Sequence, residues 1–205
     1  CPYCSFHRFV FEESAARDYY EALMREIRMY QERGYRFSGM YVGGGTPTIM
    51  LDPLLELVRV ARDDLGVKEI SIETNPNHVV PSHLEPLRNA GINRLSVGVQ
   101  SFDDTILKAI GRFEKYGSGQ ETIERLEQAS GMFDTLNIDL IFNMPLQTEK
   151  SLQHDLEIID RLNADQVTFY PLMTAPSVAA RLAETLGPID YKKEKRMYKN
   201  DRFKI

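Results

Sequence analysis

Segments with helical spacing of apolar residues alternate along the chain with short runs that have the period of a β-strand. In the first helical segment, apolar residues recur at intervals of three and four from Tyr20 to Tyr30, and we expect Ser14 to cap its N-terminus. Strands are predicted over 37–42, 68–73, 94–100, 135–142 and 166–170. Helices are predicted between them over 52–65, 82–90, 103–110, 118–129 and 148–162.

This alternation predicts an α/β fold in which crossover helices connect parallel strands. In the strand over 94–100, branched apolar residues share one face, whereas Ser96, Gly98 and Gln100 share the other. Central strands of a sheet covered on both sides usually have apolar residues on both faces. We therefore predict a partial (β/α)6 barrel of TIM-like form, with parallel strands, helices outside and a sixth strand upstream of Cys1. An ordinary α/β sheet with scattered buried polar groups is the alternative.

The composition limits the class of protein. A chain of 205 residues suits one domain of ordinary size. It contains no run of about 18 apolar residues, so we expect no membrane span. The net charge of −5 mildly disfavours a nucleic-acid-binding surface, because such domains usually carry a basic excess.

Cys1 and Cys4 form a C-x-x-C pair and are the two cysteines of the sequence. A disulfide framework usually spreads its cysteines so that they close long loops. The close spacing instead predicts metal ligation or redox chemistry in a reducing compartment, most simply the cytoplasm. The spacing alone also suits zinc knuckles and thioredoxin-like sites.

A run of three glycines, Gly43 to Gly45, follows the first predicted strand and leads into Thr46. Glycines at a strand end leave backbone N–H and C=O groups accessible to a ligand. Neither a Walker loop nor a G-x-G-x-x-G register is present. The run predicts a ligand cradle, and a flexible βα turn is the alternative.

Polar residues end the following strands as well. Glu73, Gln100 and Asp139 each lie at or near the carboxyl end of a predicted strand. In βα barrels the loops that carry catalytic groups converge at that edge. We expect these three side chains and Gly44 to meet at one rim.

Several motifs together resemble one family. C-P-Y-C-S-F, G-G-G-T-P-T, E-T-N-P, R-L-S-V-G-V-Q-S-F and N-I-D-L-I-F occur in this order between Cys1 and about Met173. They resemble the radical S-adenosylmethionine (SAM) proteins of the oxygen-independent coproporphyrinogen III oxidase family. That family includes a haem chaperone, haem-utilisation proteins that open the porphyrin ring, and certain methyltransferases.

The resemblance implies a [4Fe–4S] cluster and bound SAM. The family motif is C-x3-C-x2-C, so Cys1 and Cys4 would be its second and third cysteines, and the first would lie four residues before Cys1. SAM would chelate the iron that the cysteines leave open. The resemblance implies a SAM site formed by Gly44, Gly45, Thr46, Glu73, Gln100, Arg112, Asp139, Ile141 and Met173, with Arg112 on the SAM carboxylate and Ile141 and Met173 beside the adenine.

The reaction that the resemblance implies is cleavage of SAM to a 5′-deoxyadenosyl radical, which abstracts hydrogen from a porphyrin or similar tetrapyrrole. A one-electron donor such as flavodoxin or ferredoxin would supply the electron. A non-catalytic haem-binding chaperone and a tRNA-modifying radical SAM protein are the alternatives. We expect 1–175 to be a truncated radical SAM core, followed by an extension or linker over 176–205. With two of three cysteines, this chain alone is expected to hold no stable cluster and to be inactive.

Overall fold

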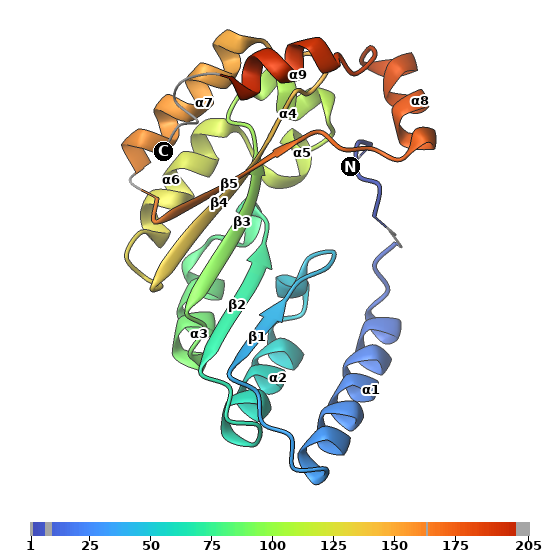
Figure 1. Cartoon of the computed structure of the whole chain (residues 1–205). Coiled ribbons are helices and arrows are strands. Elements are labelled where there is room, and N and C mark those ends of the chain that lie inside the picture. Colours follow the sequence, from blue (N-terminus) through green and yellow to red (C-terminus); the bar gives the residue numbers. More distant parts are fainter. Residues whose placement is uncertain (1, 7–9, 163, 200–205) are drawn as a thin grey trace.

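The computed structural model describes residues 2–6, 10–162 and 164–199, and its centre is a parallel sheet. The five strands lie side by side in chain order (Figure 1). They are β1 (Gly39–Val42), β2 (Glu69–Thr74), β3 (Arg94–Gln100), β4 (Thr135–Phe142) and β5 (Gln166–Pro171). Each neighbouring pair is parallel, so all carboxyl ends lie along the same edge.

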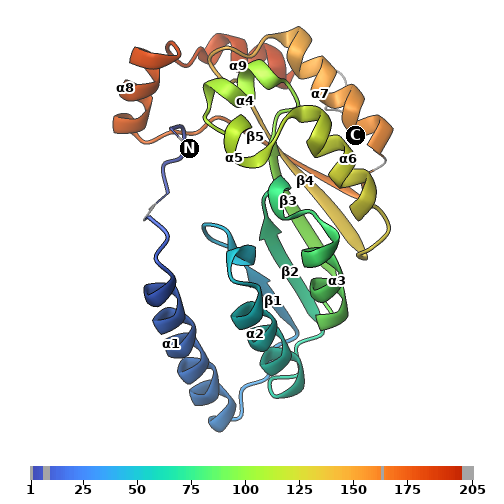
Figure 2. The ribbon, with the colours of Figure 1, turned by 180° about the vertical axis from the view of Figure 1, so that it is seen from behind.

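Helices cover one face of this sheet, as comparison of the two opposite views shows (Figures 1 and 2). The helices that pack there are α2 (Leu51–Asp63), α3 (Pro81–Ala90), α6 (Gly119–Ala129) and α7 (Glu149–Leu162). Their apolar residues and the branched residues of the strands form the main hydrophobic core. Helix α1 (Glu13–Glu32) lies beside α2 and contributes Tyr20 and Ile27 to the edge of that core.

Short helices gather at the carboxyl edge of the sheet (Figure 1). They are the 3-10 turns η1 (Pro47–Ile49) and η2 (Pro76–His78), and the helices α4 (Asp104–Ala109), α5 (Phe113–Tyr116), α8 (Pro176–Thr185) and α9 (Tyr191–Tyr198). A second apolar cluster connects this end of the molecule to the N-terminal loop. It contains Tyr3, Ile106, Ile110, Met144, Leu172, Val178 and Leu182.

The face opposite the helices is polar on every strand. The register aligns Tyr41, Ser71 and Arg94 across β1, β2 and β3, and Gly98, Asp139 and Thr168 across β3, β4 and β5. The predicted α/β fold with parallel strands and outer helices is thereby confirmed, and the sheet forms part of a TIM-like barrel. The sixth strand expected upstream stays a prediction.

One predicted detail is wrong, and another stays a prediction. Ser14 is not the N-cap of α1, because the helix begins at Glu13 and Glu12 occupies the cap position; the Ser14 hydroxyl donates to the Glu12 carboxylate and accepts no hydrogen bond from the backbone of the first turn. The boundary at residue 175 stays a prediction, although α8 and α9 each bury residues against the preceding part of the chain. None of the helices in the described ranges is both long and apolar enough to cross a bilayer.

Candidate functional site

The glycine run after β1 lies against the carboxylate at the end of β2. The backbone N–H of Gly44 donates to Glu73 Oε2 at 3.2 Å, in a conformation with φ of 122° that favours glycine. A Cβ placed on Gly44 or Gly45 would meet no atom within 4 Å. The loop therefore has free space beside its backbone, where a ligand could approach closely.

Tyr41 holds the second oxygen of the same carboxylate. Its hydroxyl, on the polar face of β1, donates to Glu73 Oε1 at 2.5 Å. Burial, this hydrogen bond and the negative charges of Glu73 and Asp139 raise the pKa of Tyr41 to about 12. Tyr41 therefore stays a hydrogen-bond donor at neutral pH and fixes the orientation of Glu73.

Asn75, two residues beyond Glu73, joins the glycine loop to Arg112. Its amide nitrogen donates to Thr46 Oγ1 at 2.8 Å, and its amide oxygen accepts from Arg112 Nη2 at 3.0 Å. Arg112 is only 4% exposed and also donates to the backbone oxygen of Gly98 in β3. The guanidinium thus binds the carboxyl ends of two neighbouring strands together.

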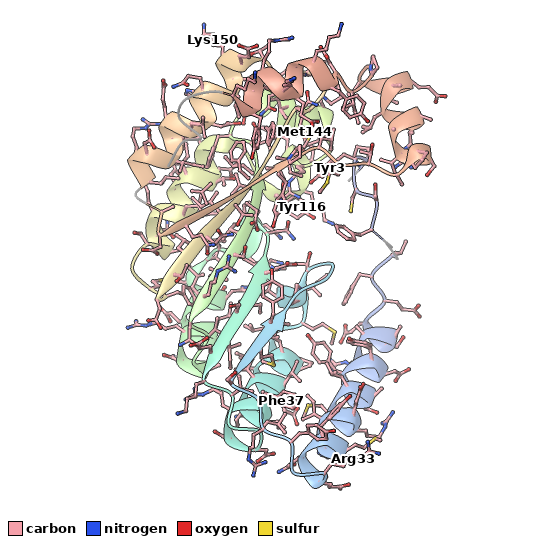
Figure 3. The ribbon with its side chains drawn as sticks, in the orientation of Figure 1. Tyr3, Arg33, Phe37, Tyr116, Met144 and Lys150 are labelled. Atoms are coloured by element: carbon pink, nitrogen blue, oxygen red, sulfur yellow. The ribbon has the colours of Figure 1, made fainter. Side chains whose placement is uncertain are left out.

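The C-x-x-C loop is fastened to the same place. Arg112 Nη1 lies 3.4 Å from the hydroxyl of Tyr3, and the guanidinium stacks over the ring of Tyr116 at 4.2 Å. Burial raises the pKa of Tyr3, while the neighbouring Arg112 charge opposes that rise. Figure 3 shows Tyr3, Tyr116 and Met144 gathered at the carboxyl edge of the sheet, far from Phe37 at the opposite edge.

Further contacts place the loop against α8. Arg181 donates to the backbone oxygen of Pro2 at 2.7 Å, and Ser5 Oγ accepts from the backbone N–H of Ala175 at 2.7 Å. Cys4, a free cysteine, lies partly exposed between these anchors. Cys1, the other predicted ligand, lies outside the described residues.

Asp139 occupies the polar face of β4 within a hydrogen-bonded row. Ser96 Oγ donates to one carboxylate oxygen at 2.7 Å, and Asn137 Nδ2 donates to the other at 2.8 Å. Thr168 in β5 donates in turn to the amide oxygen of Asn137 at 2.9 Å. Side chains from three strands therefore orient this one carboxylate.

Gln100 ends β3 in an unusual conformation. Its φ is 76°, a left-handed value, and the pairing with β4 shifts register between Gly98 and Gln100. A Cβ placed on Gly98 would lie 2.9 Å from Gln100 Nε2, so the Gln100 side chain lies over Gly98. The bulge turns the amide toward the same polar face as Asp139.

The predicted residues near the adenine differ in their surroundings. Ile141 is partly buried beside the cluster that contains Tyr3 and Met144. Met173, just beyond β5, is 71% exposed. Its predicted contact with the adenine stays a prediction, as do the ligand contacts of the other residues.

Sequence reasoning missed several residues that build the site. Asn75, Tyr41 and Asn137 lie inside or beside the motifs noted above, but nothing local shows what they contact. A signal for Asn137 is its position two residues before Asp139 on the same strand face. The predicted residues Gly44, Glu73, Gln100 and Asp139 do come to one side of the sheet.

The arrangement suits a ligand that carries both positive charge and hydroxyl groups. Two oriented carboxylates, Glu73 and Asp139, offer acceptors for ammonium or hydroxyl groups. The glycine loop offers open backbone beside them, and the fastened loop brings the Cys4 thiol to the same edge. The described residues therefore fit SAM near a thiolate-bound cluster.

Comparisons with known proteins identify a superfamily and several relatives that resemble this chain. The model of the radical SAM superfamily matches residues 1–159. The haem chaperone HemW of Bacillus subtilis is 32% identical over 183 residues, which cover 86% of this chain and 48% of that protein. The oxygen-independent coproporphyrinogen III oxidase of Paracoccus denitrificans is 30% identical over 176 residues, covering 82% of this chain and 39% of the oxidase.

Solved structures are similar as well. The coproporphyrinogen III oxidase HemN from Escherichia coli superposes with a TM-score of 0.83 and 27% identity, covering 99% of this chain and 49% of that one. SuiB of Streptococcus suis, solved with S-adenosylmethionine bound, gives a TM-score of 0.63 at 17% identity, covering 100% of this chain and 44% of that one. The latter similarity concerns the fold alone. The chain spans about half the length of the first of these relatives.

Proposed function

Because the chain belongs to the radical SAM superfamily, we propose that it is the SAM-binding core of an enzyme acting on a porphyrin or related tetrapyrrole. Its relatives include proteins named as oxygen-independent coproporphyrinogen III oxidases, and the oxidase HemN is a close structural match. Turnover in the manner of the oxidase or of a haem-utilisation protein is the form of the activity that we favour, with a methyltransferase as the variant. A reducing compartment such as the cytoplasm suits its thiolate ligands.

One observation carries the proposal: Arg112 joins the cysteine loop to the ends of β2 and β3. Through Tyr3 it reaches the loop, and through Asn75 it reaches the glycine cradle. An electron can pass from the cluster to SAM only if the cluster ligands and the SAM-binding groups are adjacent. A structural C-x-x-C loop would have no need of this connection to strand ends.

Each residue of the site has a proposed binding role. Cys4, with Cys1 and an upstream cysteine, would hold a [4Fe–4S] cluster, and SAM bound beside it would supply the radical chemistry for hydrogen abstraction. Glu73 and the Gly44 backbone would bind the methionine end of SAM, with Gly45 and Thr46 beside them. The remaining SAM contacts follow the expectations above, and a flavodoxin or ferredoxin would supply the electron.

The burial of Arg112 refines its proposed role. Its donors already reach Asn75, Gly98 and Tyr3, so the group is fixed in place before any ligand binds. A preorganised cation next to the site stabilises a carboxylate at little conformational cost. The SAM carboxylate remains its proposed partner.

A haem chaperone is the second candidate, favoured by a specific observation. The relatives named HemW, from Bacillus subtilis and from Escherichia coli, are 32% and 31% identical to this chain. Such a protein would retain the cluster and SAM site but would transfer haem without substrate turnover. The described residues are shared by both readings, so an assay must separate them.

The test uses the natural protein with its cluster reconstituted under anaerobic conditions. With SAM and dithionite, we expect 5′-deoxyadenosine to accumulate, and more of it with a tetrapyrrole present. Asp139→Ala should weaken SAM binding in calorimetry by about tenfold while the cluster absorbance stays, whereas the exposed Asp63→Ala should change neither. Stoichiometric haem binding without 5′-deoxyadenosine would favour the chaperone, and no SAM binding at all would refute the proposal.

A further inference from the structure

Helix α9 is held against the turn that follows β4. Met197 of α9 is buried together with Phe142 and Leu152. Glu194 accepts a hydrogen bond from the Asn143 amide at 3.1 Å, and Arg196 pairs with Glu149 at 3.0 Å. The last pair is exposed and contributes little, so the buried contacts hold the helix in place.

Lys193 makes the most specific of these contacts. Its ammonium donates to the backbone oxygens of Met144, Pro145 and Gln147 at 2.8, 3.2 and 3.0 Å. A lysine ammonium has three N–H donors, and here each has a carbonyl partner. The backbone of α9 is itself fixed at this point, because the Asp190 carboxylate accepts from the N–H of Lys193 at 3.0 Å.

The turn that Lys193 holds has a left-handed residue and follows the strand that carries Asp139. Asn143 is fully buried with a φ of 64°, a conformation that asparagine adopts more readily than most residues other than glycine. The turn begins four residues after Asp139. The Met144 side chain packs in the cluster that also contains Tyr3 of the cysteine loop.

The position of this turn therefore affects two parts of the proposed SAM site, namely the cysteine loop and the end of β4. A shift of Met144 would disturb the apolar cluster that also contains Tyr3, and hence the cysteine loop. A shift of Asn143 would move the end of β4, which carries Asp139 and Ile141. The three carbonyls would lose their charged partner if Lys193 were replaced by an apolar side chain, and buried carbonyls without partners are costly.

We propose that Lys193 is a positioning residue for the SAM site, acting through the backbone turn over 143–147. The inference rests on the proposed function, since it assumes that SAM binds beside Asp139 and the cysteine loop. It makes α9 a working part of the SAM-binding core and not a linker. It also predicts that the effect belongs to this one lysine and not to the basic character of the helix.

The experiment compares Lys193→Met with Lys195→Met in the natural protein, reconstituted with its cluster. Lys195 lies on the same helix but is exposed, so it controls for the lost charge and for helix propensity. Hydrogen exchange of the 143–148 peptide without SAM reports the turn, and SAM titration by calorimetry reports the site. Lys193→Met should speed exchange in that peptide and raise the Kd for SAM about tenfold, with neither change in Lys195→Met.

The stoichiometry of the titration separates positioning from simple loss of fold. Irreversibly misfolded protein lowers the fraction that binds SAM but leaves the Kd of the folded fraction unchanged. Reversible unfolding raises the apparent Kd only by the reciprocal of the folded fraction, which circular dichroism measures. A positioning role raises the Kd beyond that factor at unchanged stoichiometry. If Lys193→Met does not fold, Lys193→Arg provides the same comparison, because its fork should satisfy some of the carbonyls and raise the Kd by a smaller factor.

The outcomes separate the role of Lys193 from the proposed function. Unchanged exchange in the 143–148 peptide, or faster exchange with an unchanged Kd, would overturn the role of Lys193 while the proposed function stands. An equal loss in Lys195→Met would also overturn it. A natural protein that binds no SAM would refute the proposed function, and this inference with it.

Discussion

Asp155 on α7 gives a stability prediction whose sign and size follow from its burial. Its side chain is 1% exposed and accepts from the Ser101 hydroxyl and the Phe102 backbone N–H, each at 2.8 Å. Burial raises the pKa of this carboxyl from 3.8 to about 6, although both hydrogen bonds oppose the rise. The ionised form is therefore less favoured in the folded protein than in the unfolded chain.

The linkage between protonation and folding gives the direction. Between pH 4 and pH 6 the folded state retains a proton on Asp155 that the unfolded state has lost. Stability from this group is therefore complete below about pH 4 and is lost as the pH rises through about 6. A shift of about two units, at about 1.4 kcal/mol each, makes the loss about 3 kcal/mol.

Urea denaturation followed by circular dichroism between pH 4.5 and pH 8 measures the effect. The variant Asp155→Asn cannot ionise, but its amide oxygen can still accept from Phe102. We expect its free energy of unfolding, relative to that of the natural protein, to rise by about 2 kcal/mol across this range, because about a third of the full loss occurs below pH 4.5. Other carboxyl groups contribute equally to both proteins and cancel in the difference.

The exposed Asp63→Asn is the matched control and should follow the natural protein at every pH. If Asp155→Asn and the natural protein have parallel pH profiles, then burial does not shift this group and the reasoning is wrong. If the difference has the opposite sign, the hydrogen bonds from Ser101 and Phe102 outweigh the burial. Either result would also mean that the ionised Asp155 carboxylate, beside the loop after Gln100, does not destabilise the folded protein.

Three further substitutions separate the site from the scaffold. Gly45→Ala should leave the melting temperature unchanged, because its Cβ meets no atom within 4 Å, but should weaken SAM binding about tenfold in calorimetry. Gly119→Ala should leave SAM binding unchanged but lower the free energy of unfolding by about 2 kcal/mol in urea denaturation. The reason is that its Cβ would collide with the backbone oxygen of Phe102. Tyr41→Phe should raise the Kd for SAM about fivefold, with little change in stability, since it removes one hydrogen bond from Glu73. Unchanged affinity in Gly45→Ala and Tyr41→Phe would contradict the placement of SAM beside Glu73.

Much of the fold could be predicted because its signals are local. Period two in β3 and β4 separates an apolar face from a polar one, and the helices between the strands have clear apolar spacing. Ser118 begins its helix with a complete capping box, as a local motif should. The single-turn helix α5 and the helix α8 were not predicted, since their residues are fixed by contacts with the N-terminal loop and the second apolar cluster.

The site was predictable in its members but not in its connections. Glu73 could be assigned to the end of its strand from the sequence, and Asp139 to the polar face of its strand, although β4 continues for three residues beyond Asp139. The left-handed conformation of Gln100 depends on a register shift against β4, which no local pattern encodes. The partners of Arg112 lie 37 and 14 residues away along the chain, so only the folded sheet brings them together.

These long-range connections explain why a generic C-x-x-C motif can belong to a specific site. Cys4 has no distinguishing feature in its own segment, and its significance comes from Tyr3 next to it. Tyr3 reaches Arg112 and belongs to the apolar cluster that contains Met144, and the backbone of Met144 is held in turn by Lys193. A change in α9 can therefore reach the cysteine loop through packed side chains and backbone carbonyls alone. On this reasoning Arg112→Met and Lys193→Met should both loosen the cysteine loop in hydrogen exchange, and together they should do so by less than the sum of their separate effects, because both act through Tyr3.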